Sequence, residues 1–240
     1  MRRWYRKNLT LEGKIVTFKK LLSDHFNKFS ASPFLFVGSG MSRRYLGAEN
    51  WEDLLKKFCE IIGENYTKIR SQADGDLTKI ASVLSKSYSE KWWDSEIKGE
   101  KDIQYSEHLL KSDSPLKVEI SSYLKEIHEN VNEDYREEIE LLKSSKIDGV
   151  ITTNWDLFLE SIFSEFSVFI GQEGLFASRN YGVAEIYKIH GSCNDPNSLV
   201  LTQEDYEKFK KKNPYLSSKL LTIFVEHPII FLGYSLTDPH

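Results

Sequence analysis

Four apolar segments of the chain each end in small or polar residues of the types that bind phosphate or transfer protons. Glycines let the backbone turn tightly and approach a diphosphate, whose charge can be met by backbone N–H groups. Asparagine offers a donor and an acceptor without net charge, and a neutral histidine can take a proton near pH 7. The four segment ends are Gly38-Ser39-Gly40-Met41-Ser42, Thr152-Thr153-Asn154-Trp155-Asp156, His190-Gly191-Ser192 and Gly233-Tyr234-Ser235.

Each of these motifs also has a purely structural interpretation. Gly38-Ser39-Gly40 can be read as a tight turn, and His190 as a hydrogen-bonded structural residue at the end of a strand. The dehydrogenase fingerprint is not met, because position 43 holds Arg and no strand-end carboxylate follows about 20 residues later. Glu60 has roughly that spacing but falls inside a predicted helix. The combination of four motifs therefore favours a nucleotide site over plain turns, and disfavours a hydride-transfer enzyme.

The elements that must position these motifs alternate between strands and helices. Short apolar runs without polar alternation predict strands, and apolar residues at steps of three and four predict helices. This alternation indicates an α/β fold with a doubly wound, mostly parallel Rossmann-like sheet, in which ligands bind beyond the carboxyl ends of the strands. The predicted strands are 34–37, 147–153, 168–170, 185–192 and 228–232, and the predicted helices are 10–29, one from the N-cap Asn50, about 156–166 and one from a capping box at 202–205.

Residues 68–145 differ in composition, since they are rich in Ser, Lys and Glu and contain no convincing buried strand. We therefore expect a helical insertion there, within a Rossmann-like domain formed by 31–67 and 146–240, after an N-terminal helical segment at 1–30. The pair Trp92-Trp93 is expected to fill the small core of the insertion or to mark a contact surface. Because the chain stops just after a predicted strand, we expect the domain to be truncated at its C-terminal end or continued in a longer polypeptide.

Charge, cysteine content and hydropathy exclude several classes of protein. There are 32 basic and 36 acidic residues, a balance that gives no general electrostatic reason to bind nucleic acid or an anionic membrane. Apolar runs are far shorter than the ~20 residues that span a bilayer, and no apolar signal segment follows the basic start of the chain. The two cysteines, Cys59 and Cys193, form no Cys-x-x-Cys pair, so neither a zinc module nor a metal site is expected. We expect a cytoplasmic protein without disulfides.

Taken together, the four motifs resemble those of sirtuins. The segment 38–42 resembles the sirtuin Gly-Ala-Gly-x-Ser loop with Ser39 in place of Ala, and 152–156 resembles its Thr-Gln-Asn-Ile-Asp motif. His190-Gly191 matches the sirtuin His-Gly, and 233–235 resembles Gly-Thr-Ser. The motifs appear in the family's order and span residues 33–238.

A closer likeness is to the sirtuin-like domains of bacterial anti-phage defence proteins. These commonly contain Trp-x-x-Leu-Leu, as at Trp51–Leu55, a Thr-Asn-Trp/Tyr-Asp core, and Leu-Thr-x-x-Asp-Tyr, as at Leu201–Tyr206. The resemblance implies hydrolysis of NAD+ to nicotinamide and ADP-ribose, which depletes the infected cell of NAD+. It also implies a homo-oligomer, a phage component as trigger, and a further C-terminal domain or partner subunit.

The same resemblance assigns roles to single residues. Asn154 would hold the nicotinamide ribose and position the attacking water, and His190 would be the general base. Asp156 would contact the nicotinamide amide. The residues expected to bind NAD+ are Gly38, Ser39, Gly40, Ser42, Thr153, Asp156, Gly233 and Ser235, with no metal.

Two other functions remain open from the residues alone. Sirtuin deacylases use an acyl-lysine in place of water and carry a four-Cys zinc module that this chain lacks, so NAD-dependent deacylation ranks second. A noncatalytic module that senses NAD+ or ADP-ribose ranks third, because binding alone would not need both Asn154 and His190.

Overall fold

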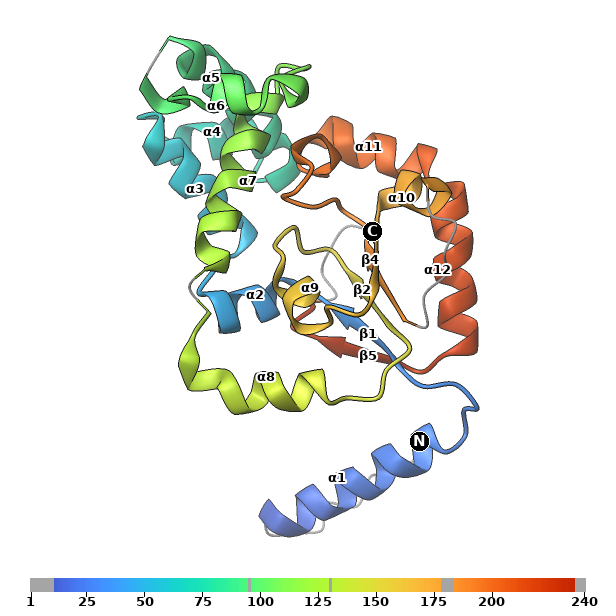
Figure 1. Ribbon diagram of the computed structural model, residues 1–240. Helices are drawn as coiled ribbons and strands as arrows, with labels where there is room; N and C mark the ends of the chain where they lie inside the picture. Colours follow the sequence, from blue (N-terminus) through green and yellow to red (C-terminus); the bar gives the residue numbers. More distant parts are fainter. Residues whose placement is uncertain (1–10, 95, 130, 178–183, 236–240) are drawn as a thin grey trace.

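The computed structural model describes residues 11–94, 96–129, 131–177 and 184–235 (Figure 1). Its strands are β1 (Phe34–Val37), β2 (Gly149–Thr152), β3 (Ser167–Ile170), β4 (Glu185–Lys188) and β5 (Ile229–Leu232). Its α-helices are α1 (Leu11–Phe26), α2 (Ser39–Leu46), α3 (Trp51–Ile61), α4 (Tyr66–Gln72), α5 (Leu77–Trp93), α6 (Lys101–Gln104), α7 (Ser114–His128), α8 (Arg136–Lys143), α9 (Phe158–Ile162), α10 (Gly171–Ala177), α11 (Gln203–Lys212) and α12 (Pro214–Glu226). Short 3-10 turns cover Glu96–Lys98, Ser106–His108, Glu133–Tyr135 and Pro196–Ser198.

The strands form one parallel sheet in the order β3-β4-β2-β1-β5. Val37 pairs with Thr152 on one side and Leu232 on the other, and Thr152 pairs with Lys188. The carboxyl ends of β1, β2, β4 and β5 therefore lie at the same edge. This confirms the predicted α/β fold and brings the segments that follow these four strands to one side of the sheet.

Helices cover both faces of the sheet, as the apolar strands require. Alternate strand residues point to opposite faces, so Leu35, Val37 and Val150 pack with α2, α8 and α9, whereas Phe34, Phe36 and Ile151 pack with α10 and α12. The two clusters share the strand backbones and no side chains. The sheet is thus the middle of three layers.

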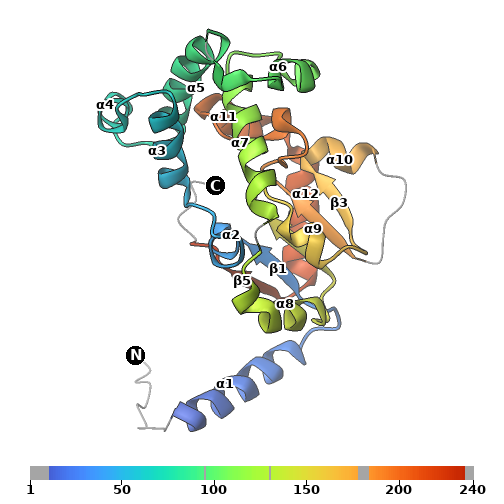
Figure 2. The same cartoon turned by 60° about the vertical axis from the view of Figure 1, so that its left-hand side comes forward.

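Helices α3, α4, α5 and α7 form a third cluster beyond the carboxyl edge, next to α11 (Figures 1 and 2). Trp92 is fully buried there and its indole N–H donates to Glu119 Oε1 at 2.9 Å, whereas Trp93 is half exposed. Cys59 is also buried in this core, as expected for a small apolar residue. Because α3 precedes residue 68 and shares the cluster, this core extends beyond the predicted insertion. The domain limits remain a prediction.

Two parts of the predicted secondary structure were wrong. The segment after Gly38, expected as a loop, is the helix α2, and the helix expected at about 156–166 spans only α9. Gly and Ser have low helix propensity, so α2 gives little local signal and depends on burying Met41, Tyr45 and Leu46 against the sheet. The N-cap at Asn50 and the capping box of Thr202 and Asp205 are confirmed.

Outside these layers, α1 extends away from the sheet and exposes Phe18 and Leu21 (Figures 1 and 2). The basic residues of the first ten positions lie outside the described residues. No helix in the described ranges is both long and apolar enough to cross a membrane.

Truncation of Leu116 tests the third cluster. Leu116 on α7 is fully buried, so Leu116→Ala should lower the free energy of unfolding by about 2–5 kcal/mol. Leu141→Ala, the same change at an exposed position of α8, should cost no more than about 0.5 kcal/mol. Urea unfolding measures both, and equal losses would contradict this packing.

Candidate functional site

The side chain of Asn154 joins the turns that follow β1 and β2. Its amide Nδ2 donates to Gly38 O at 3.0 Å and to Ser42 Oγ at 2.9 Å. Because Gly38 O can only accept, the orientation of the amide is determined by its partners. Both amide hydrogens are thereby used within the protein. What Asn154 can offer a substrate is its carbonyl oxygen, an acceptor.

The network continues to Asp156. Ser42 Oγ donates to Asp156 Oδ2 at 2.5 Å, and Asp156 Oδ1 accepts the backbone N–H of Phe158 at 3.0 Å, at the start of α9. This bond closes a local turn over Leu157, the N-cap residue of α9, and fixes the backbone that leads into the helix. Asp156 therefore has a structural function in addition to the predicted contact with nicotinamide, which stays a prediction.

Thr152 fixes the start of the same turn. Its hydroxyl donates to Val37 O at 3.0 Å and accepts the N–H of Asn154 at 3.0 Å. The hydroxyl of Thr152 thus binds the neighbouring strand β1 at the point where the regular pairing of β1 and β2 ends. Thr153 follows and is half-buried.

The glycine turn lies against the segment that follows β5. Gly40 N–H donates to Gly233 O at 2.9 Å. A Cβ placed on Gly38 would come within 2.7 Å of Tyr234 Cα, and one on Gly40 within 2.7 Å of Gly233 Cα. Gly233 itself has a φ of +61°, in the region that favours glycine. The glycines at 38 and 40 are needed for this approach of two turns, and their predicted contact with a diphosphate stays a prediction.

His190 stands beside the Asn154 turn. Each of the two residues lies two positions beyond a register pair, Asn154 after Thr152 and His190 after Lys188. The loops that follow are joined directly, because Cys193 N–H donates to Trp155 O at 2.8 Å. The structure thus brings Asn154 and His190, 36 positions apart, to the ends of adjacent strands.

In this conformation the site is closed. The side chains of Ser42, Asn154, Asp156 and His190 are all buried, with relative exposures of 3–8%. Ser39 and Ser235 are exposed. A dinucleotide can reach the buried groups only after a movement that uncovers them.

An open hollow of about 800 Å³ adjoins the glycine turn, bordered by Gly40, Arg43, Arg44 and Tyr135. The Arg44 guanidinium lies 4.2 Å from the centroid of the Tyr135 ring and binds both carboxylate oxygens of Glu138, at 2.9 and 2.6 Å. The hydrogen bond from Arg44 lowers the pKa of Glu138. The Arg44 guanidinium is therefore paired with Glu138. The side chain of the neighbouring Arg43 is exposed beside Gly40.

Lys188 is a residue of the site that the sequence interpretation missed. Its ammonium, 1% exposed, contacts Glu160 Oε1 at 2.6 Å and donates to the carbonyl oxygens of Trp155 and Asp156. Through these bonds Lys188 fixes the backbone of the turn that contains Asn154. The available signal was a lysine between Tyr187 and Ile189 in a predicted buried strand, since a buried ammonium needs partners.

Burial also affects the cysteine beside His190. It raises the pKa of the Cys193 thiol to about 11, and that of Cys59 likewise to about 11. A thiol that stays protonated at neutral pH is a poor nucleophile. No cluster of His, Cys, Asp and Glu suited to a metal ion occurs in the described part of the chain.

Thiol labelling tests this burial. At pH 8 a thiol with a pKa of about 11 is roughly 0.1% thiolate, so Cys59 and Cys193 should react far more slowly with iodoacetamide in the native protein than in urea. Mass spectrometry over time measures both rates. Rapid native labelling of Cys193 would contradict its burial in the loop after β4.

Residues 148–240, which contain Asn154, His190 and Gly233, match the family model described as a SIR2-like domain. The chain is 24% identical over 224 residues to "NAD(+) hydrolase ThsA" of Bacillus cereus (strain MSX-D12), which covers 86% of this chain and 37% of the relative. It is 29% identical over 234 residues to "NAD(+) hydrolase ThsA" of Cytobacillus dafuensis, covering 95% of this chain and 40% of the relative.

A shorter match, 31% over 98 residues, links it to "Defense-associated sirtuin 2" of Bacillus subtilis, covering 37% of this chain and 9% of the relative. The chain spans about two fifths of the length of the ThsA relatives. These matches confirm the resemblance to sirtuin-like defence proteins that the four motifs indicate.

Proposed function

We propose that this chain is the NAD+-hydrolysing, sirtuin-like domain of an anti-phage defence protein, which releases nicotinamide and ADP-ribose and so depletes the infected cell of NAD+. The observation that carries the proposal is the adjacency of the Asn154 and His190 turns, joined by the bond from Cys193 to Trp155. Relatives named NAD(+) hydrolase support it.

The chemistry suits these two side chains. Loss of nicotinamide leaves an oxocarbenium-like ribose, as in glycoside hydrolysis. The Asn154 carbonyl oxygen, left as an acceptor by the bonds of its amide hydrogens, would bind a ribose hydroxyl or the attacking water without placing a positive charge near the cation. His190 would take the proton of that water, a contribution of typically ~10²–10⁴-fold.

The phosphates would bind at the start of α2. Backbone N–H groups and the helix dipole favour an anion at such a terminus, and Ser39 and Arg43 are exposed beside it. Because Gly233 and Tyr234 lie on Gly38 and Gly40, binding requires that the segment after β5 moves aside. Movements of this kind commonly gate catalysis.

The proposal extends to how the protein assembles and what activates it. We infer that the protein acts as a homo-oligomer, and that a further domain of the same polypeptide or a partner subunit responds to a phage component. The greater length of the ThsA relatives supports a further domain. The resemblance to defence proteins supports the other two inferences.

The first test uses two point variants. His190→Ala should lower the rate of nicotinamide release by about 10²–10⁴-fold, and Asn154→Ala by about 10²-fold through lost positioning, while the far-UV circular dichroism spectrum stays unchanged. Asn194→Ala and His25→Ala, at exposed positions, are the matched controls. Release by either site variant at near the parent rate would show that the site assignment is wrong.

A second test separates hydrolysis from deacylation. Incubation with NAD+ alone should yield nicotinamide and ADP-ribose, measured by liquid chromatography, because water is the acceptor. Strict dependence on an added acyl-lysine peptide would favour the deacylase. Binding of NAD+ without turnover, at every protein concentration and in the presence of phage lysate, would favour the sensor.

A further inference from the structure

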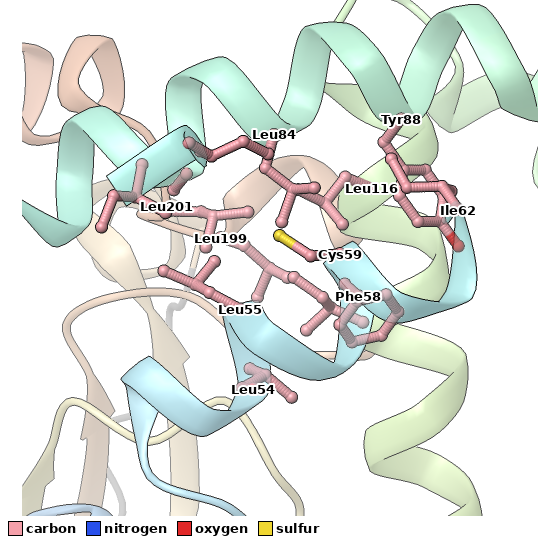
Figure 3. Close-up of a cluster of buried hydrophobic side chains, with 14 of the residues drawn as sticks. Leu54, Leu55, Phe58, Cys59, Ile62, Leu84, Tyr88, Leu116, Leu199 and Leu201 are labelled. Atoms are coloured by element: carbon pink, nitrogen blue, oxygen red, sulfur yellow. The ribbon is translucent and has the colours of Figure 1, made fainter. Parts of the chain in front are cut away.

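The segment that follows His190 is embedded in the core of the helical region. Cys193, Leu199 and Leu201 are buried at 0–1% exposure in the same cluster as the side chains of α3, α5 and α7. Figure 3 shows Leu199 and Leu201 among Leu55, Cys59, Leu84 and Leu116. Helices α3, α5 and α7 thus enclose part of the loop that follows His190, the general base proposed above.

This segment is bonded back to His190. Val200, between the two buried leucines, donates its N–H to His190 O at 2.9 Å. Gly191 has a φ of +97°, and a Cβ there would lie 2.2 Å from Ser198 O, so the loop closes tightly on itself. Residues 199–201 are therefore in direct backbone contact with His190.

A buried ion cluster fixes the next residues. The Lys117 ammonium of α7, 2% exposed, lies 2.7 Å from Asp113 Oδ2 and 2.8 Å from Asp205 Oδ2. Asp205 Oδ2 also accepts the N–H groups of Leu201 at 3.1 Å and Thr202 at 2.9 Å. Burial raises the pKa of Asp205, but the Lys117 charge and these hydrogen bonds outweigh it, and the pKa lies below its usual value.

Asp205 belongs to the capping box at the start of α11. This helix places two aromatic residues against His190. The rings of Tyr206 and Phe209 lie edge-on to the imidazole, with centroids at 5.6 and 5.2 Å. Tyr206 in turn stacks on Trp51 of α3, with centroids 5.7 Å apart. Two rings of α11 thus pack against the imidazole, and α11 in turn contacts α3, α5 and α7.

We propose that Lys117, through Asp205 and α11, positions the His190 imidazole for proton transfer, so that the ion pair between α7 and α11 supports the proposed general base. The proposal rests on the proposed function of His190. It also explains two motifs without a role in the chemistry, Trp51–Leu55 and Leu201–Tyr206. Their residues build the support of His190, and Lys117 links that support to α7.

Loss of the ammonium would remove the ion pair that joins α7 to α11. In Lys117→Met, Asp113 and Asp205 would face each other in a buried place without a cation, and the carboxylate would lose its anchor on α7. A displacement of a catalytic group by about 1 Å can cost ~10²-fold. We expect kcat to fall about 10- to 10²-fold with KM changed less than threefold, and Lys117→Arg to restore much of it.

The matched control is Lys101→Met. Lys101, 30% exposed against 2% for Lys117, binds Glu119 at 2.7 Å and joins α6 to α7 in the same helical region. Nicotinamide release gives kcat and KM for the parent and the variants. Nitrogen-15 spectra of the imidazole, with the His190 signal assigned from His190→Ala, report its environment without catalysis.

The expected result is that Lys117→Met lowers kcat and shifts the His190 signal, whereas Lys101→Met does neither. An unchanged His190 signal in Lys117→Met overturns the proposal, as does an equal shift in both variants. If the parent shows no hydrolysis of NAD+, the proposed function fails. The imidazole spectra still decide whether Lys117 positions His190.

Discussion

One side-chain amide, that of Asn154, joins the first two strand ends of the sheet. Its partners Gly38 and Ser42 precede it by 116 and 112 positions, so the contact exists only when α2 through α8 have brought β2 beside β1. Parallel neighbours require such a crossover. Here the crossover is also the support of the second catalytic candidate, because it contains α7.

Three strand ends are locked to one another in this way. Asn154 binds the turn after β1, Lys188 below it binds the carbonyl oxygens of Trp155 and Asp156, and Cys193 binds Trp155 from the loop after β4. The fourth, after β5, lies on the glycines of the first. The first three turns are thus fixed by hydrogen bonds and the fourth covers the glycines, an arrangement that suits the exclusion of bulk water in the proposed hydrolysis.

The parts predictable from sequence are those encoded by neighbouring residues. The strands stand out as apolar runs, Asn50 as a cap, and Thr202 with Asp205 as a capping box, because each depends on a few adjacent positions. By contrast, α2 forms from residues with little local preference for a helix, and its stability comes from the sheet. The contacts of Lys188 with Glu160, of Gly233 with Gly40 and of Lys117 with Asp205 join residues that no spacing rule connects. The polar residues at the strand ends indicated the edge of the sheet at which we propose the site. They gave no indication that Gly38 and Gly40 are needed because the turn after β5 lies against them.

Each strand is only four residues long. The register between the strands therefore determines which polar groups meet at the carboxyl edge of the sheet. Sliding β2 by one position along β1 would move each of its side chains to the opposite face of the sheet, so that Val150 would leave one helical layer and Ile151 the other. The same slip would carry the amide of Asn154 past the carbonyl of Gly38. Correct alignment of these short strands is therefore also the condition for assembling the proposed site.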